Sequence, residues 1–478
     1  MANPDPATSL TTRTTANATI NVLGALWGGV LGVIQVPIIL RALGAGPYGI
    51  YVLITAVAAY LGLVELNLSS ALVKYVAEYA GRNERAKIQE VIGTTIALYL
   101  GLATSAAVVF LLAGRALLPH LNIPADSIPI AWEALEITAC ALPFTFIAGT
   151  LGMVPAAIGR FDISVIVSVA LGTVSTIGAV CAVLLGGRLV ALTAVNALVS
   201  VLATVVSVMV GRRLFPGVSF RPRWIRARAA QLLRFSVFSL LSKLSGALVQ
   251  TADRIAIGVA LGPAAVAYYS VPASLLRRIT GVTNRMSYVI LPVASDLSGR
   301  EDRSRLKRAY IRSARITWLV GAPAAIVLVV LAHPLLALWV GHEFADRGVW
   351  VMRAFAVAFA FDTAANVPAL VTEGMGHPKV SGGFAAARAV VNLGLLIPAV
   401  LYLGVNGVGA TYLLASAALV PPFLHYVQTR LVGLTWSETL RCIYVPTMDD
   451  VRMDVKDVWR ALRGRLRLAP SSPAGREL

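Results

Sequence analysis

Long apolar stretches separated by short polar clusters repeat along most of the chain, from about residue 18 to residue 428. Each stretch, folded as a helix, is long enough to cross the roughly 30 Å hydrocarbon core of a bilayer. Cutting the chain at its clusters of charged residues, Gly and Pro predicts twelve membrane helices. They cover residues 18–40, 48–73, 91–113, 132–157, 163–185, 189–211, 235–260, 264–293, 316–340, 351–375, 381–403 and 407–428.

The two halves of the chain share landmarks at a nearly constant offset. Gly44 recurs as Gly262, and the charged segment 81–85 recurs as 299–303 at the same offset. Gly159 recurs as Gly376, at an offset that is shorter by a single position. Six is an even number of crossings, so the two copies have the same orientation. We therefore expect an all-α polytopic membrane protein with about twelve transmembrane helices, arranged as two six-helix parallel repeats around a central cavity.

The repeat predicts five segments along the chain. They are a cytoplasmic N-terminal tail (1–17), an N-terminal six-helix bundle (18–211), a basic cytoplasmic linker (212–234), a C-terminal six-helix bundle (235–428) and a basic cytoplasmic tail (429–478). The linker mixes seven Arg with Phe, Trp, Ile and Leu. This composition suits an amphipathic helix on an anionic leaflet, and a plain linker that only sets topology is the alternative.

Composition changes this picture only after position is considered. The chain is 57% apolar and has a formal net charge of +18, which in a soluble protein would indicate a nucleic-acid partner. Outside the predicted helices, however, 30 Lys and Arg lie in alternate loops and at both chain ends, and 4 lie in the other loops. Cytoplasmic loops attract such residues. The charge therefore reports topology, with both termini in the cytoplasm and no nucleic acid as partner.

Several other functions are disfavoured by missing motifs. The chain has no Gly-Lys dipeptide and hence no P-loop for nucleotide hydrolysis. Its three Cys are far apart, which disfavours a zinc site or a disulfide framework. The predicted loops contain no grouping of His, Asp, Glu or Ser large enough for an active site. We therefore expect neither an enzyme nor a bound cofactor.

Basic residues within the predicted helices are the candidate binding groups, because charge inside a membrane is costly and usually functional. Lys243, Gln250 and Arg254 share one face of their helix at spacings of seven and four. The next helix carries a second group, namely Arg277, Arg278 and Arg285. Together they predict a cationic wall suited to a diphosphate or an acidic sugar. In the alternative, the arginines extend toward the cytoplasmic surface, or Arg254 only pairs with Asp253.

Acidic residues within the predicted helices are candidates for ion coupling. Asp362 and Glu373 share a stripe with Asn366, and Glu65 lies in the second predicted helix. Together with Asp253, these carboxylates would couple transport to H+ or Na+ if they titrate. The alternative is that they only balance the charge of neighbouring arginines.

Three segments carry a resemblance to a known family. Residues 43–51 read Leu-Gly-Ala-Gly-Pro-Tyr-Gly-Ile-Tyr, residues 71–79 read Ala-Leu-Val-Lys-Tyr-Val-Ala-Glu-Tyr, and residues 253–258 read Asp-Arg-Ile-Ala-Ile-Gly. They resemble the polysaccharide transporter family, the O-antigen and exopolysaccharide flippases of the multidrug/oligosaccharidyl-lipid/polysaccharide flippase superfamily. Glu65 and Asn67 depart from the family pattern, where an Asp and a Gly are expected.

The resemblance implies a specific activity and location. It implies translocation of an undecaprenyl-diphosphate-linked oligosaccharide across the bacterial cytoplasmic (inner) membrane by alternating access, with a polysaccharide polymerase or export complex as partner. Three alternatives stay open at this stage. They are a cation-coupled multidrug exporter of the same superfamily, a membrane enzyme that polymerises or ligates glycans, and a lipid-binding scaffold in an export complex.

Overall fold

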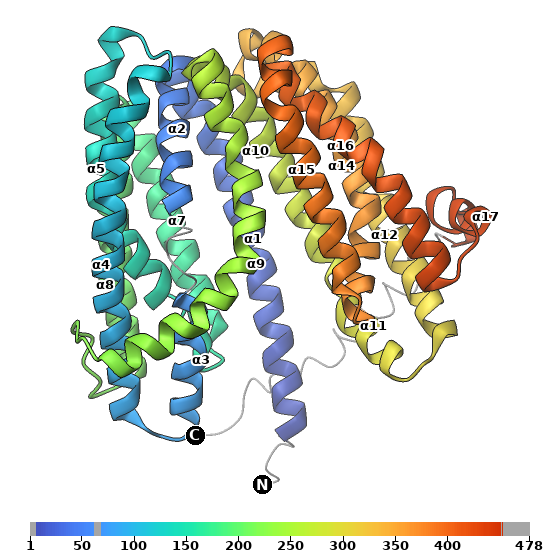
Figure 1. Ribbon diagram of the computed structural model, residues 1–478, viewed down its shortest axis with the longest axis horizontal. Helices are drawn as coiled ribbons and strands as arrows, with labels where there is room; N and C mark the ends of the chain where they lie inside the picture. Colours follow the sequence, from blue (N-terminus) through green and yellow to red (C-terminus); the bar gives the residue numbers. More distant parts are fainter. Residues whose placement is uncertain (1–5, 62–67, 451, 453–478) are drawn as a thin grey trace, which may run out of the picture. The chain divides into compact units, whose positions relative to one another are not determined.

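The computed structural model describes residues 6–61, 68–450 and 452, and every regular element in them is helical (Figure 1). The Cα positions divide the chain into two compact units. Unit 1 contains residues 1–275, 333–351 and 393–408, and unit 2 contains residues 276–332, 352–392 and 409–478.

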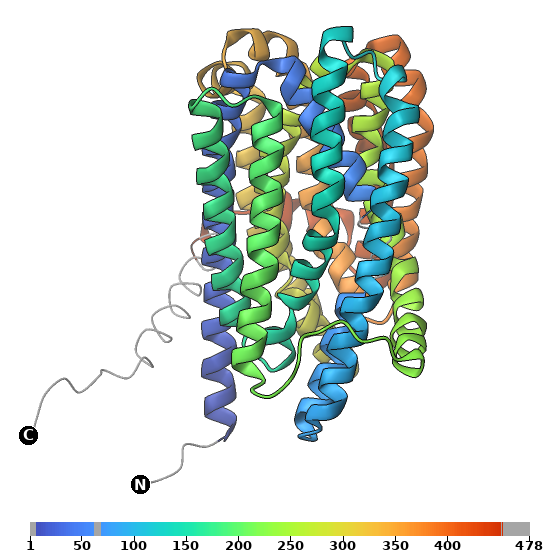
Figure 2. The same ribbon diagram turned by 90° about the vertical axis from the view of Figure 1, so that its left-hand side faces the viewer.

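The first predicted copy lies within unit 1, and its helices run alongside one another (Figure 2). They are α1 (Pro6–Leu43), α2 (Ala45–Leu61), α3 (Leu68–Gly81), α4 (Arg85–Leu117), α5 (Ile128–Leu151), α6 (Val154–Ala157), α7 (Phe161–Leu184) and α8 (Leu189–Leu214). The predicted helix at 48–73 corresponds to α2 and α3. Glu65 lies between them, outside the described residues.

The second copy follows the same order of long helices. They are α9 (Arg226–Leu261), α10 (Pro263–Ser287), α11 (Ile290–Gly299), α12 (Arg303–Val330), α13 (Ala332–Val340), α14 (His342–Gly374), α15 (Pro378–Leu403) and α16 (Val405–Tyr426). Beyond α16 the chain forms a π-helical turn (Val427–Val432), α17 (Trp436–Thr439) and a second π-helical turn (Leu440–Tyr444).

Three helices predicted as continuous are interrupted in the structure. The predictions for 132–157, 264–293 and 316–340 were wrong in this respect, because each corresponds to two helices. In each case the second helix has a proline in its first turn: Pro155 in α6, Pro292 in α11 and Pro334 in α13. Proline is accepted in a first turn, where no intrahelical partner for its nitrogen is needed, but it disfavours helix in the residue before it.

The backbone confirms the internal duplication. Every residue with positive φ in the described part of the chain has a counterpart at nearly the same offset in the other copy. The pairs are Gly44 and Gly262, Asn83 and Glu301, Asn122 and Gly341, Gly159 and Gly376, Gly186 and Gly404, and Gly217 and Gly433. Left-handed residues mark tight turns between helices. Their matching positions show that the two copies turn at equivalent points.

Nine helices among the described residues are long and apolar enough to cross a membrane. α9 and α10 are not among these nine. The three arginines of α10 lower its mean hydropathy, and part of α9 lies outside the described residues, to which the count of nine is restricted. The protein is thus a multi-pass, all-α membrane protein built from two repeats, while the total of twelve membrane helices stays a prediction.

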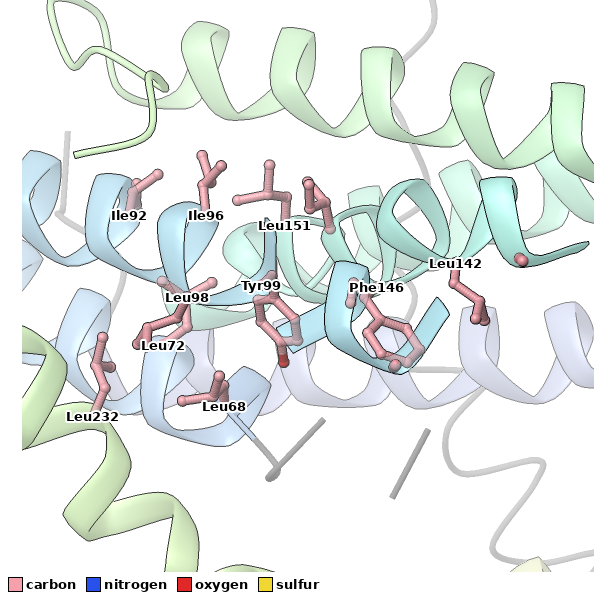
Figure 3. Packing of buried hydrophobic residues seen from close by; sticks show 14 of the residues in the cluster. Leu68, Leu72, Ile92, Ile96, Leu98, Tyr99, Leu142, Phe146, Leu151 and Leu232 are labelled. Carbon is pink, nitrogen blue, oxygen red and sulfur yellow. The ribbon is translucent and has the colours of Figure 1, made fainter. Parts of the chain in front are cut away.

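Buried apolar side chains hold the first copy together (Figure 3). Leu68 and Leu72 of α3 pack with Ile92 and Tyr99 of α4 in this cluster. The ring of Tyr99 meets the edge of the Phe146 ring from α5, with 6.3 Å between centroids. Close packing of this kind drives helix association in a bilayer, where the lipid is as apolar as the side chains. The helices α3, α4 and α5 therefore pack together as one group through these side chains.

The linker between the copies is not a helix. α8 continues to Leu214, α9 begins at Arg226, and residues 215–225 form no helix. The prediction of one amphipathic helix through residues 212–234 is therefore wrong. The backbone nitrogen of Arg223 instead donates to the carbonyl oxygen of Gly93 on α4, at 3.0 Å. Two prolines in the segment also disfavour a helix.

The chain after α16 packs back onto α12 within unit 2. Lys307 of α12 forms an ion pair with Glu438, with 3.1 Å between Nζ and Oε1. The backbone N–H of Thr435, followed by Lys307, lowers the pKa of the Glu438 carboxyl. Arg315 of α12, which is 8% exposed, reaches Asp450 at 3.3 Å. The beginning of the predicted basic tail is thus attached to the second copy.

Gly49 lies at a close approach between the copies inside unit 1. A methyl group on Gly49 of α2 would overlap the carbonyl oxygen of Pro263, at the start of α10. We predict that Gly49→Ala lowers the free energy of unfolding by about 1–3 kcal/mol, because the backbones must separate. Chemical unfolding in mixed micelles measures the loss. Gly46→Ala in the same helix is the matched control, since its added Cβ meets nothing within 4 Å. Equal stability of the two variants would contradict the close approach.

Candidate functional site

α9 carries the first group of predicted binding residues. Its backbone is helical from Arg226 to Leu261, so Lys243, Gln250 and Arg254 share one side of it, as their spacing predicts. The side chains of Lys243 and Gln250 lie outside the described residues. Arg254 is half-buried.

Asp253 and Tyr269 link α9 to α10 within unit 1. Gly262, with φ of 84°, ends α9, and Pro263 begins α10 directly after it. This turn brings Tyr269 to Asp253, whose carboxylate accepts a hydrogen bond from the tyrosine hydroxyl at 2.7 Å. Asp253 is 1% exposed. A carboxylate is therefore buried beside the predicted cationic stripe.

α10 carries the second group of basic residues, in its part within unit 2. Arg277 and Arg285 are exposed on the protein surface and Arg278 is half-buried. Neither Arg277 nor Arg285 has an ion-pair partner among the described residues. Asn284, beside them, accepts a hydrogen bond from Asn366 of α14 at 2.6 Å. The two exposed guanidinium groups can therefore pair with an anion from outside the protein.

A bidentate ion pair joins α14 to α15 within unit 2. Arg388 Nη1 lies 2.6 Å from Asp362 Oδ1, and Nη2 donates to Oδ2 at 2.9 Å. Nη2 also donates to the hydroxyl of Ser416 on α16 at 3.0 Å. Such fork-to-fork pairing is the strongest form of an Arg–carboxylate interaction. The sequence indicated both charged residues but not their pairing.

The other predicted acid of α14 has different surroundings. Glu373 is exposed and accepts a hydrogen bond from Ser381 of α15 at 3.2 Å. Asp362, Asn366 and Glu373 lie on one helix as predicted, yet each contacts a different partner. No group of three or more His, Cys, Asp and Glu in the described residues could hold a metal ion.

A cavity in unit 1, mostly apolar but with several uncharged polar side chains in its lining, was not predicted from the sequence. It has a volume of about 460 Å³ and lies between α2, α5 and α8. Thr193, Asn196 and Ser200 line it from α8. Their spacing of three and four puts them on one face of a helix, which is the signal that would have indicated it. A search for charge alone passes over such uncharged residues.

Comparison with protein families identifies the chain. The model of the family described as "Polysaccharide biosynthesis protein" matches residues 14–298, which is more than half of the sequence. The chain belongs to the polysaccharide biosynthesis protein family. A second family model, MatE, matches residues 239–397 of this family member.

Individual relatives of this polysaccharide biosynthesis protein are distant but nearly full length. A Shigella flexneri protein named "Putative O-antigen transporter" is 20% identical over 80% of this chain and 89% of its own length. The structure "Lipid II flippase MurJ, inward closed conformation" superposes with a TM-score of 0.70 at 13% identity, covering 92% of each chain. An inward-facing multidrug resistance MATE family transporter of the MOP superfamily has a TM-score of 0.66 at 15% identity, covering 84% of this chain and 94% of that one. Both structures share the fold of this chain.

In this family member the two copies differ in charge. All seven Lys and Arg that the sequence places within membrane helices belong to the second copy. At the offset that relates Gly44 to Gly262, Lys243 corresponds to Ala25 and Arg254 corresponds to Val36. The copies share a backbone plan, but the sequence predicts cations inside the membrane for the second copy alone.

Proposed function

We propose that this protein is a flippase, which translocates an undecaprenyl-diphosphate-linked oligosaccharide across the cytoplasmic membrane by alternating access. The substrate would be a precursor of O-antigen, exopolysaccharide or a related polysaccharide. The observation that carries the proposal is the concentration of intramembrane cations on α9 and α10 in a member of the polysaccharide biosynthesis protein family. The name of the Shigella relative and the fold shared with the MurJ structure support it.

The chemistry of the substrate explains the cations. A lipid-linked diphosphate brings negative charge into a region of low dielectric constant, where an unpaired charge is costly. Guanidinium groups match phosphate oxygens with two parallel hydrogen bonds. We assign this role to six residues, with the exposed Arg277 and Arg285 best placed to receive an anion. The six are Lys243, Gln250, Arg254, Arg277, Arg278 and Arg285.

Four carboxylates are proposed to couple transport to H+ or Na+, with no other cofactor. They are Glu65, Asp253, Asp362 and Glu373. Burial of Asp253 supports its candidacy, because a buried carboxylate within a membrane helix is costly and marks a functional site by default. The Arg388 contact of Asp362 supports charge balance instead.

The uneven distribution of basic residues supports the proposed placement in the membrane. With 30 Lys and Arg on one face and 4 on the other, both termini would lie in the cytoplasm of a bacterial cell. The six-helix bundles at residues 18–211 and 235–428 would then move against each other. A polysaccharide polymerase or export complex would receive the translocated lipid.

The main competing function is a cation-coupled multidrug exporter, which the MatE match to residues 239–397 favours. An exporter of organic cations needs acidic and aromatic groups in its cavity. The charged side chains that the sequence places inside the membrane on α9 and α10 are instead mostly basic. The Shigella relative is named a transporter and the MurJ structure a flippase, which also favours transport over a polymerase or ligase activity.

Liposomes that contain only this protein test the proposal. We expect a membrane-impermeant quencher to reach nearly all of a fluorescent undecaprenyl-diphosphate glycan, because the inner-leaflet pool exchanges outward. In empty liposomes only the outer leaflet should be quenched, and a fluorescent phosphatidylcholine controls for general scrambling. Quenching limited to the outer leaflet in protein-containing liposomes would overturn the flippase. Formation of new glycosidic bonds would indicate a polymerase or ligase instead.

A further inference from the structure

The cavity between α2, α5 and α8 shares no lining residue with the cationic site described above. All of its lining residues belong to unit 1, and Figure 1 labels its three helices. The lining contains no Lys, Arg, His, Asp or Glu. Its volume of about 460 Å³ falls within the range of roughly 300–1,000 Å³ that small-molecule pockets occupy.

Two side chains of the cavity have donor capacity to spare. Asn196 Nδ2 donates to the hydroxyl oxygen of Tyr51 at 3.1 Å, and Asn196 Oδ1 accepts from Ser175 at 3.2 Å. An amide nitrogen carries two protons, and a tyrosine hydroxyl that accepts one bond still has its own proton. Asn196 and Tyr51 can therefore each donate one more hydrogen bond to a ligand.

Threonines in the lining supply acceptors. The hydroxyl of Thr55 donates to the Tyr51 carbonyl at 3.0 Å, and that of Thr138 donates to the Ala134 carbonyl at 2.7 Å. A hydroxyl that donates to its own helix keeps its oxygen lone pairs available. Across the cavity, Thr145 donates to Ser200 at 3.0 Å. Donors and acceptors are thus mixed in one cavity.

This combination selects among classes of ligand. A phosphate would need cations, and an organic cation would need acids or a cage of aromatic rings. A lipid tail would leave the spare donors of Asn196 and Tyr51 without partners, which is costly inside a membrane. Sugar hydroxyls both donate and accept hydrogen bonds, and the C–H faces of a sugar ring can pack against the rings of Tyr51 and Phe146 in the lining.

Two key positions of the cavity differ in the second copy. Tyr269 corresponds to Tyr51 at the offset that relates Gly44 to Gly262, but its hydroxyl donates to the buried carboxylate of Asp253. Leu414 occupies the position that corresponds to Asn196. Thr145 and Thr193 have threonines at the equivalent positions 363 and 411, so the Asn196 amide and the spare proton of the Tyr51 hydroxyl are what distinguish the first copy.

We propose that the cavity between α2, α5 and α8 is a glycan subsite that binds an uncharged sugar residue of the transported lipid. The assignment rests on the proposed flippase function and names the part of the substrate that the first copy recognises. Asn196 and Tyr51 donate to sugar hydroxyls, and the threonine hydroxyls accept from them. The cations of the second copy then serve the diphosphate, so that the two copies recognise different parts of one substrate.

Photolabelling of the full chain in lipid nanodiscs tests the subsite. The probe is a short-chain alkyl glucoside with a diazirine on the sugar, used at micromolar concentration and mapped by mass spectrometry. We expect labels on α2, α5 and α8. The variants Asn196→Leu and Thr145→Val should each reduce this labelling at least about fivefold, because each removes one or more hydrogen bonds. Thr104→Val is the matched control, since its exposed hydroxyl bonds only its own helix.

Two comparisons make the outcome decisive. An alkyl diazirine of the same chain length without the sugar should label these helices weakly and equally in all variants. Equal labelling by both probes, or wild-type labelling of Asn196→Leu, would overturn the subsite. Ser200→Ala provides a milder change if Asn196→Leu does not fold. Because labelling requires no transport, a chain that binds the sugar probe but moves no lipid would contradict the flippase and leave the subsite intact.

Discussion

Replacing Lys243 and Arg285 together by Gln will abolish translocation of the lipid-linked glycan while membrane insertion continues. Both substitutions remove a cation and keep a side chain of similar length. Hydrogen bonds to a charged group contribute about 1.5–3 kcal/mol each, so losing two should slow transport at least about 100-fold. The rate of quenching in the liposome assay measures this loss, and recovery of folded protein from the membrane measures insertion.

A surface arginine provides the control for this double variant. Arg300 lies beyond α11, and its exposed side chain pairs with Asp296 at 2.9 Å. Arg300→Gln removes a positive charge from a loop and should leave the transport rate within about twofold of the wild type, because solvent-exposed ion pairs contribute little. If the Lys243 and Arg285 double variant moves glycan as fast as Arg300→Gln does, the assignment of the cationic site is wrong.

Asp362→Asn should lower the free energy of unfolding by about 3 kcal/mol. The substitution removes the carboxylate from the pair with Arg388, whose side chain is 22% exposed, and leaves a partly buried guanidinium without its counter-charge. Breaking one side of such a pair commonly costs more than the pair contributes. Chemical unfolding in mixed micelles measures the change. The double variant Asp362→Leu/Arg388→Met should regain most of the lost stability.

The same variants decide between the two interpretations of Asp362. If Asp362 only balances Arg388, the double variant will transport glycan with the same dependence on H+ and Na+ gradients as the wild type. Loss of that dependence, with transport retained, would identify Asp362 as the coupling group. Glu373→Gln is the control for stability, because its exposed carboxylate accepts only the hydrogen bond from Ser381 among the described residues. A full stability loss in the Asp362→Leu/Arg388→Met variant would contradict the charge-balance interpretation.

Much of the fold was predictable because every segment that crosses a bilayer is subject to the same physical constraint. A chain that crosses lipid must satisfy its backbone hydrogen bonds within each segment and present apolar side chains, so hydropathy locates most of the helices. The offset of Gly44 and Gly262 indicated the repeat from the order of residues alone. Helix interruptions were less predictable, because prolines such as Pro143 and Pro323 lie inside intact helices whereas Pro292 follows a break.

For the candidate sites, the sequence likewise indicated single residues but not the contacts between them. The cost of an intramembrane charge belongs to each residue separately, so Arg277 and Arg285 were recognisable without their neighbours. Pairing depends on which helices pack together. Asp362 and Arg388 are 26 residues apart, and the backbone spacing on either helix says nothing about their contact.

The sequence by itself determined that this is a duplicated, multi-pass helical membrane protein, because hydropathy and repeat offset are properties of the chain in order. It also predicts that the intramembrane cations belong to one copy. Only the tertiary structure decided that residues 215–225 lie against α4, that Arg388 neutralises Asp362, and that Tyr51 and Asn196 meet across a cavity. Tyr51 and Asn196 are 145 residues apart and uncharged. Their shared cavity exists only because α2, α5 and α8 pack side by side.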